Sequence, residues 1–209
     1  MAYIEQVSIE NATGKTARLY QSAVERAGDV ANIIRVMSQD GASANASMNL
    51  YVSIMKADNH LSGAQREMLA TVVSNANDCF YWTLFHARDF GLESGNKELA
   101  ELLVFDYRNC GFNQLDTALC DYAVELTCRP AEMSQANIDR LRKVGLADDQ
   151  ITIATQVISY FNYINRIADG LGVDLEDWMT TSEESWKSEK PNWRSWAWRE
   201  WRDKKMRPE

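Results

Sequence analysis

The sequence contains little proline: three residues among 209, of which the first is Pro130. Proline interrupts helices, so its scarcity favours long helices. Few stretches alternate between apolar and polar residues, which is the pattern of a half-buried strand. The chain also lacks an apolar run of the roughly 18 residues that cross a bilayer. Its opening residues 1–10 are polar and acidic, so we expect no signal peptide and no membrane partner. These absences predict an all-α protein with no sheet of consequence.

Cysteine is also scarce, with four residues in the chain. Without a secretion signal, four cysteines in a chain of this size do not suggest a disulfide framework. Cys120 and Cys128 would lie on one helix, roughly 12 Å apart along its axis at about 1.5 Å per residue, and a disulfide spans only about 7 Å. We therefore expect free thiols and a cytoplasmic, reducing compartment.

Basic residues are outnumbered, with 22 against 30 acidic residues and a formal net charge of −8. A nucleic-acid partner is therefore not expected, because phosphate contacts need a basic face. Hydrophobic residues make up 45% and charged residues 25%, which is typical of a globular protein. This length suits one medium domain, which we assign to residues 1–178.

Residues 179–209 differ from the rest and form a basic, tryptophan-rich tail. Five of the seven tryptophans lie at positions 186, 193, 196, 198 and 201. Trp193, Trp196, Ala197 and Trp201 would share one face of a helix, preceded by a linker at residues 171–185. Such an aromatic face suits an interface core, so we expect the tail to pack across a subunit boundary of a homo-oligomer. Docking on an anionic membrane is the weaker alternative, because the acidic body would be repelled.

Helix boundaries are legible around residues 62–91. Ser62 followed by Gln65 forms a capping-box pattern that marks a helix start. The polar run at residues 74–78 interrupts the apolar pattern, and a second helix is expected from Cys79 to Phe90 with Gly91 as its stop. We expect the two helices to pack as an antiparallel pair, with Asn77 or Asp78 capping the second.

The chain has two histidines, His60 and His86. His60 lies in the expected turn and is interpreted as a solvated loop residue. Cys79, Trp82 and His86 share one helical face by their spacing of three and four residues. A thiol in the first turn of a helix meets unsatisfied N–H groups, which favour the thiolate and lower its pKa. Each residue also has a plain structural interpretation: a buried thiol, a core indole and a core histidine.

These residues carry a family resemblance. Glu67, Cys79 and His86 stand as in the motif of the alkylhydroperoxidase D and carboxymuconolactone decarboxylase superfamily, which has Glu, eleven residues, Cys-x-x-Cys, three residues and His. The sequence resembles the peroxidase-related branch, both around residues 61–74 and at residues 160–173, over roughly residues 15–178. The resemblance implies an alkylhydroperoxidase D-like helical bundle that forms homo-oligomers. In the second block, Asn165 and Arg166 are interpreted as structural hydrogen-bonding residues.

The sequence departs from this motif at its second cysteine, where Trp82 stands. In the family the two thiols form a disulfide, and the histidine reaches the second thiol. Cys79 and His86 are seven residues apart, roughly 10 Å along the axis, so they are not expected to touch. What remains is a carboxylate and an imidazole beside one thiol and a large indole.

Three hypotheses follow. The first is a cofactor-free enzyme in which Glu67 and His86 act as base and acid on a small organic substrate, with Trp82 as the stacking wall and a decarboxylase, isomerase or lyase reaction. The second is a one-cysteine peroxidase in which Cys79 attacks a hydroperoxide and an external thiol, or Cys110, Cys120 or Cys128, reduces the sulfenic acid. The third is a non-catalytic assembly protein. No metal is expected, because no zinc-ligand spacing occurs and the region offers at most one or two good ligands.

Overall fold

The computed structural model describes residues 1–195, and these residues contain helices and connecting segments but no strand. The long helices are α1 (Gly14–Ala27), α3 (Gly41–Tyr51), α4 (Gly63–Ala76), α5 (Phe80–Ser94), α7 (Gln114–Cys128) and α9 (Asp148–Leu171). Shorter helices are α2 (Asn32–Val36), α6 (Lys97–Phe105), α8 (Gln135–Lys143) and α10 (Glu183–Glu189). Within residues 1–195, no helix has the length and apolar character needed to cross a membrane. The predicted all-α fold is confirmed.

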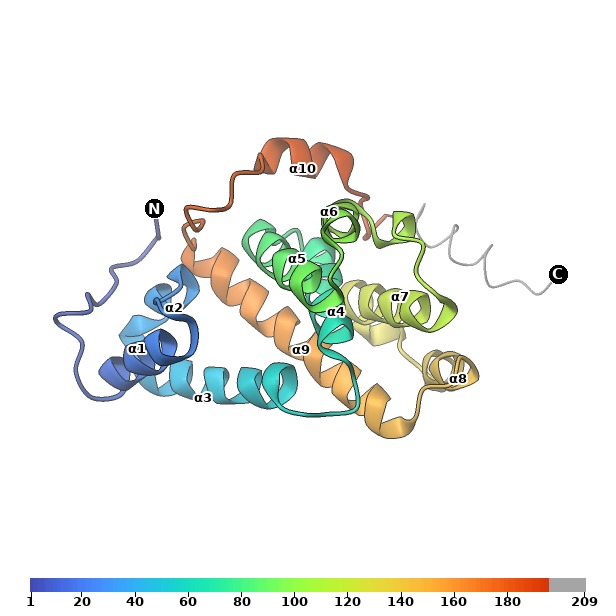
Figure 1. Cartoon of the computed structure of the whole chain (residues 1–209), viewed down its shortest axis with the longest axis horizontal. Helices are drawn as coiled ribbons and strands as arrows, with labels where there is room; N and C mark the ends of the chain where they lie inside the picture. The colour runs from blue at the N-terminus through green and yellow to red at the C-terminus, as the bar shows by residue number, and fades with distance from the viewer. Residues whose placement is uncertain (196–209) are drawn as a thin grey trace.

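Two helices form the centre of the molecule. The α4 helix packs against α5, α7 and α9, and its residues 67–76 are all buried. The α9 helix runs diagonally through the bundle, with α1–α3 at one end and α6–α8 at the other (Figure 1). The predicted antiparallel pair consists of α4, which carries Glu67, and α5, which carries His86, and their packing holds both side chains away from solvent.

The predicted capping box at the start of α4 is present. The Ser62 hydroxyl accepts the Gln65 backbone N–H at 3.1 Å, and the Gln65 side chain accepts the Ser62 N–H at 3.2 Å. The turn to α5 differs from the prediction. Ser74 and Asn75 are buried in the last turn of α4, and Cys79, instead of Asn77 or Asp78, occupies the N-cap of α5. Asp78 takes a left-handed φ of 63°, which makes the reversal tight.

The predicted stop of α5 at Gly91 is wrong. The helix continues to Ser94 and ends at Gly95, whose φ of 68° is left-handed. Gly91 is instead buried where α5 meets α6, and a Cβ added there would lie 3.2 Å from the Cβ of Ala100. The glycine therefore serves a close approach of two helices, which a sequence pattern does not distinguish from a C-cap.

The C-terminal segment, residues 179–195, covers one face of the bundle, where α10 lies above α5 and α6 (Figure 1). Trp186 is fully buried, and its indole N–H donates to the carbonyl of Val104 at 2.9 Å. Trp193 donates to Asn75 Oδ1 at 2.6 Å and stacks on Tyr107. Part of the predicted linker is thus the helix α10. Trp193 lies in a turn, and the rest of the predicted tryptophan face falls outside the described residues.

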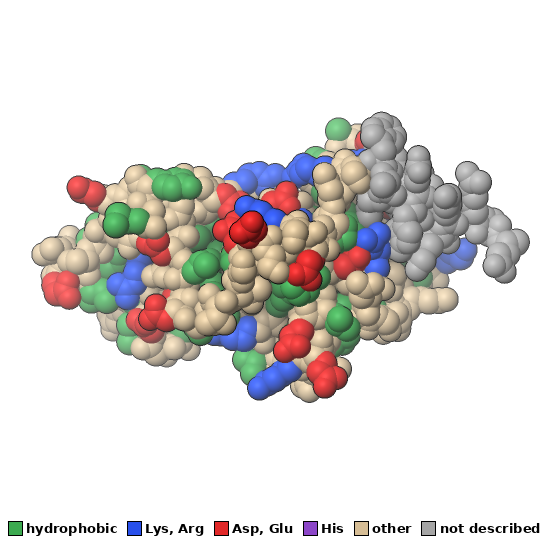
Figure 2. Space-filling model, turned by 90° about the horizontal axis from the view of Figure 1, so that it is seen from above, with side chains coloured by type: hydrophobic (Ala, Val, Ile, Leu, Met, Phe, Trp, Pro, Cys, Tyr) green, Lys and Arg blue, Asp and Glu red, His purple; other side chains and the backbone are tan. Residues whose placement is uncertain are grey.

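On the face that carries α10, acidic and basic side chains are interspersed with small hydrophobic patches (Figure 2). This mixture is typical of a solvated surface.

Candidate functional site

Glu67 and His86 form a buried pair between α4 and α5. The imidazole Nδ1 lies 2.5 Å from Glu67 Oε2, and the side chains of both residues are at most 2% exposed. Lys56, at the end of a π-helical turn formed by Val52–Lys56, donates to the other carboxylate oxygen, Oε1, at 3.0 Å. The carboxylate is therefore held between an ammonium and an imidazole.

The protonation of this pair follows from its surroundings. Burial raises the pKa of the Glu67 carboxyl, but His86 and Lys56 together outweigh burial, so the net pKa lies below the ordinary value. An ionised carboxylate only accepts hydrogen bonds, so the proton in this bond belongs to His86 Nδ1. The other ring nitrogen, Nε2, is buried and has no hydrogen-bond partner in the structure. Nε2 is therefore the atom of the pair left free to exchange a proton.

Aromatic rings enclose the imidazole. Trp82 stacks on it with centroids 5.0 Å apart and planes 19° apart, and Phe161 meets it edge-on at 4.5 Å. Tyr51 approaches at 6.5 Å. The indole N–H of Trp82 is buried as well and has no hydrogen-bond partner among residues 1–195. The indole of Trp82 thus stacks on the imidazole, at the motif position where the family that this chain resembles has a thiol. Its N–H does not extend the hydrogen bonding of the Glu67–His86 pair.

Cys79 is fully buried at the N-cap of α5. Burial raises the pKa of its thiol well above the ordinary value, and the negative charge of Asp169 raises it further. The predicted lowering of this pKa is therefore wrong, because desolvation and a neighbouring carboxylate outweigh the backbone N–H of Trp82 that favours the thiolate. All four cysteines are free, as expected.

A cavity of about 250 Å³ adjoins the site, between α1–α3, α5 and α9. Its aromatic lining residues are Tyr51, Trp82, Phe85 and Tyr160, its charged ones are Arg26, Asp29, Lys56, Arg88 and Asp89, and several aliphatic side chains complete the wall. We call it the aromatic cavity. Glu67, Cys79 and His86 do not line the aromatic cavity. Two of its lining residues contact the buried pair: Trp82 stacks on His86, and Lys56 binds Glu67.

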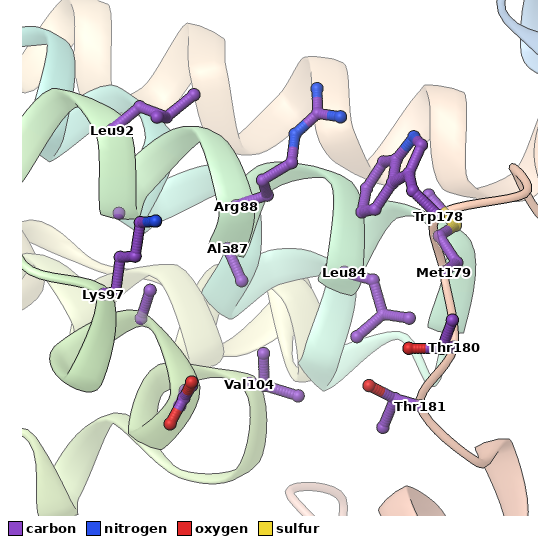
Figure 3. Close-up of a pocket in the computed structure, with 13 residues that line it drawn as sticks. Leu84, Ala87, Arg88, Leu92, Lys97, Val104, Trp178, Met179, Thr180 and Thr181 are labelled. Carbon is purple, nitrogen blue, oxygen red and sulfur yellow. The ribbon is translucent and has the colours of Figure 1, made fainter.

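A larger cavity of about 480 Å³ lies on the other side of α5, bounded by α6 and residues 178–181 (Figure 3). Arg88 lines both cavities, and its guanidinium lies 4.1 Å from the ring centroid of Trp178 and 5.0 Å from that of Phe85. This cavity contains none of the predicted site residues, so it is separate from the chemistry of the pair.

The other predicted residues have structural surroundings. His60 is 61% exposed in its side chain and lies 3.2 Å from Asp149, as a loop histidine does. Asn165 donates to the Ser74 hydroxyl at 3.0 Å and accepts from Asn77, which joins α9 to the end of α4. Arg166 donates to Asn162 within α9.

One group of possible metal ligands lies in the described part of the chain. Donor atoms of Glu67, His86 and Asp89 lie within 4.8 Å of one another. This adds one ligand to the two that the sequence indicates. However, both oxygens of Glu67 already bind cationic or N–H donors, and the Lys56 ammonium beside them opposes a metal cation.

Sequence reasoning missed Lys56 and Tyr51. Both precede the predicted motif and lie on another segment, and neither has a spacing that links it to Glu67 or His86. The apolar residues of this segment, Met48, Val52 and Met55, recur at helical spacing, a pattern that predicts only core packing.

Solved structures with this fold include peroxidase-related proteins. An uncharacterised peroxidase-related protein from Silicibacter sp. TM1040 is 28% identical with a TM-score of 0.75, covering 82% of this chain and 90% of that one. An uncharacterised peroxidase-related protein from Ralstonia eutropha JMP134, with an alkylhydroperoxidase AhpD core, is 19% identical with a TM-score of 0.79, covering 84% of this chain and 93% of that one. The debrominase Bmp8, in complex with 2,3,4-tribromopyrrole, is 13% identical with a TM-score of 0.70, covering 90% and 96%.

No protein-family model and no curated protein matches the sequence. The helical architecture and the peroxidase-related neighbours agree with the two sequence blocks that resemble the same superfamily. The chain therefore has the alkylhydroperoxidase D-like helical fold and is similar to peroxidase-related proteins.

Proposed function

We propose that this protein is a cofactor-free enzyme that transfers a proton to or from a small organic substrate in the aromatic cavity. Glu67 and His86 are the acid–base pair, and the reaction is of the decarboxylase, isomerase or lyase type. The observation that carries the proposal is the buried hydrogen bond between Glu67 and His86 Nδ1, which leaves Nε2 without a partner. A buried polar atom without a partner costs free energy in a folded protein and is a feature of functional sites.

The pair and the cavity are connected by Lys56. Its ammonium binds Glu67, lines the aromatic cavity and is 39% exposed in its side chain. Lys56 therefore brings the ligand space next to the carboxylate of the pair, while Trp82 covers the imidazole and offers a flat surface to a ring. One protein of the same fold, the debrominase, holds a planar aromatic ring, which supports a ligand of this shape.

Deuterium exchange tests the proposal. Small carbonyl and carboxylate compounds with an acidic C–H bond are incubated with the protein in D₂O, and label uptake and loss of CO₂ are followed by NMR. Replacement of the acid–base pair, Glu67→Gln or His86→Ala, should each lower the rate by roughly two orders of magnitude or more. Cys79→Ser is the matched control and should change the rate little. Full activity in Glu67→Gln would refute the assignment.

The second candidate is thiol peroxidase activity at Cys79, which the peroxidase-related neighbours favour. The buried thiol with a raised pKa argues against it, because the thiolate is the form that attacks a peroxide. Stoichiometric conversion of Cys79 to a sulfenic acid by hydrogen peroxide, with an inactive Cys79→Ser variant, would establish the peroxidase and reject proton transfer.

Homo-oligomer formation with the tail in the interface and a cytoplasmic compartment stay predictions. Trp186 and Trp193 are buried against their own chain, so neither indole is available for a contact between subunits. Light scattering on the full chain and on a chain lacking residues 187–209 measures whether the tail holds subunits together.

A further inference from the structure

The dimensions of the aromatic cavity limit its ligand. A volume of about 250 Å³ exceeds the roughly 150 Å³ in which an engineered apolar cavity holds benzene. Trp82, Phe85, Tyr51 and Tyr160 supply flat walls, and flat rings stack on such walls favourably. The cavity therefore fits one aromatic or conjugated ring with a substituent of a few atoms.

The acidic side chains that line the cavity have ion-pair partners, but one of its basic side chains has none in the part of the chain that the structure describes. Of its two carboxylates, Asp89 pairs with Arg88 at 3.2 Å and Asp29 pairs with Arg35, which does not line the cavity, at 3.6 Å. The guanidinium of Arg26, in contrast, has no ion-pair or hydrogen-bond partner among the described residues. In a cavity, an arginine with no carboxylate of its own attracts an anionic group, even in a protein with a net charge of −8.

Arg26 is close enough to influence the cavity walls. Burial raises the pKa of Tyr160 to about 12, and the positive charge of Arg26 opposes that rise. The same charge acts on Tyr51, whose pKa burial raises even further. The Arg26 charge therefore reaches the two tyrosines that face the ligand space.

Lys56 is the second cationic side chain of the cavity with N–H groups that are not used within the described part of the protein. An ammonium has three N–H donors, and among residues 1–195 the structure gives Lys56 one partner, Glu67. Its backbone lies in the π-helical turn Val52–Lys56, where the Ala57 N–H reaches back to the Val52 carbonyl at 3.0 Å. Such turns are rare and frequently occur at functional sites.

We propose that Lys56 and Arg26 form an anion-binding site in the aromatic cavity and that the substrate is a single-ring or conjugated planar acid, with its carboxylate on these cations and its ring on Trp82. This proposal rests on the proposed function and names the substrate class of the same site. Its carboxylate would bind next to the Glu67–His86 pair, so the ring carbon bearing it lies near the group that moves the proton.

Binding of benzoate and benzamide tests the proposal without any turnover. The two probes have the same shape and differ in charge, so isothermal titration measures the preference for the anion directly. Wild-type protein should bind benzoate at least roughly tenfold more tightly than benzamide, because a charge-assisted hydrogen bond contributes about one factor of ten or more. Added salt should weaken benzoate binding and leave benzamide binding unchanged.

Variants locate the site. Lys56→Met and Arg26→Met should each weaken benzoate binding several-fold or more and leave benzamide binding within about twofold. Lys97→Met is the matched control, because Lys97 is an exposed lysine that lines the larger cavity (Figure 3). Should Lys56→Met fail to fold because Glu67 loses its cation, the double variant Lys56→Met with Glu67→Gln removes both charges and is titrated in its place.

The outcomes separate this proposal from the proposed function. Equal binding of benzoate and benzamide, or loss of the preference in Lys97→Met but not in Lys56→Met and Arg26→Met, would overturn the anion site even if neutral compounds exchange protons. A benzoate preference that depends on Lys56 would support the anion site, and a complete lack of proton exchange would then overturn only the catalytic proposal.

Discussion

Trp82 covers the imidazole of His86, and truncating it should open the pair to solvent. Trp82 is 6% exposed, and its indole separates the fully buried His86 from the aromatic cavity. In Trp82→Ala the space of the indole joins that cavity, so water and small reagents should reach Nε2. Trp82→Phe keeps a ring over the imidazole and should keep it covered.

The stability cost can be worked from the same geometry. Truncating a buried tryptophan to alanine costs about 3–5 kcal/mol. One side of Trp82 already faces an open cavity, so fewer contacts are lost than in a closed core, and we expect a loss near the lower end, about 3 kcal/mol. For a domain of this size, 1 kcal/mol corresponds to about 2–4 °C, so the melting temperature should fall by about 6–12 °C. Trp82→Phe should lose less than half of this.

Diethyl pyrocarbonate, which acylates accessible imidazole nitrogens, provides the assay. The chain has two histidines, one exposed and one buried, so the reagent should modify only His60 rapidly in the wild type. In Trp82→Ala, still folded below its melting temperature, His86 should be modified as well. When both proteins also carry His60→Gln, no histidine should be modified with Trp82 in place, and one histidine, His86, should be modified with Trp82→Ala. Rapid modification of both histidines in the wild type, or of only one in Trp82→Ala, would refute the inference that the indole seals the pair.

Further predictions concern acidity, thiols and the C-terminal segment. The lowered pKa of Glu67 stabilises the fold above about pH 4.5, the ordinary value, and this contribution is lost as pH falls through the lowered pKa. The difference in urea midpoint between wild type and Glu67→Gln should therefore shrink on acidification, and a difference that is constant from pH 7 to pH 3 would contradict this. Cys79→Ser should leave the number of thiols that react rapidly with a disulfide reagent unchanged, because the buried thiol does not react in the folded protein. Trp186→Ala should cost about 3–5 kcal/mol in calorimetry, since it removes a fully buried indole and its bond to the Val104 carbonyl, whereas a melting temperature within 2 °C of wild type would mean that the segment is passive.

The sequence predicts the parts of this fold that depend on local chemistry. The capping box at Ser62 acts within one turn, so its pattern marks the start of α4 correctly. Glu67 and His86 are brought together because the motif spacing places them on paired helices. Both predictions need only the residues of two adjacent helices.

Predictions that depend on distant packing are the ones that fail. The pKa of Cys79 is set by burial and by Asp169, which lies ninety positions away in the chain, and not by its own helix end. Gly91 is a contact point for α6, and Lys56 reaches Glu67 across a loop from a separate helix. No local pattern records these partners, since each is determined by how the helices dock.

The anchoring of the C-terminal segment also sets an order of events during folding. Its two indoles bind groups that lie 82 and 118 positions earlier in the chain, at Val104 and Asn75. These acceptors come together only after α4 and α6 have docked, so residues 179–195 have no surface to settle on before then. Trp186 and Trp193 therefore stay exposed to solvent while the rest of the chain collapses. Tryptophan fluorescence should then reach its final value later than the helical signal in circular dichroism does. Until that last step the indoles of Trp186 and Trp193 stay exposed to solvent, and apolar surface exposed in an incompletely folded chain favours aggregation.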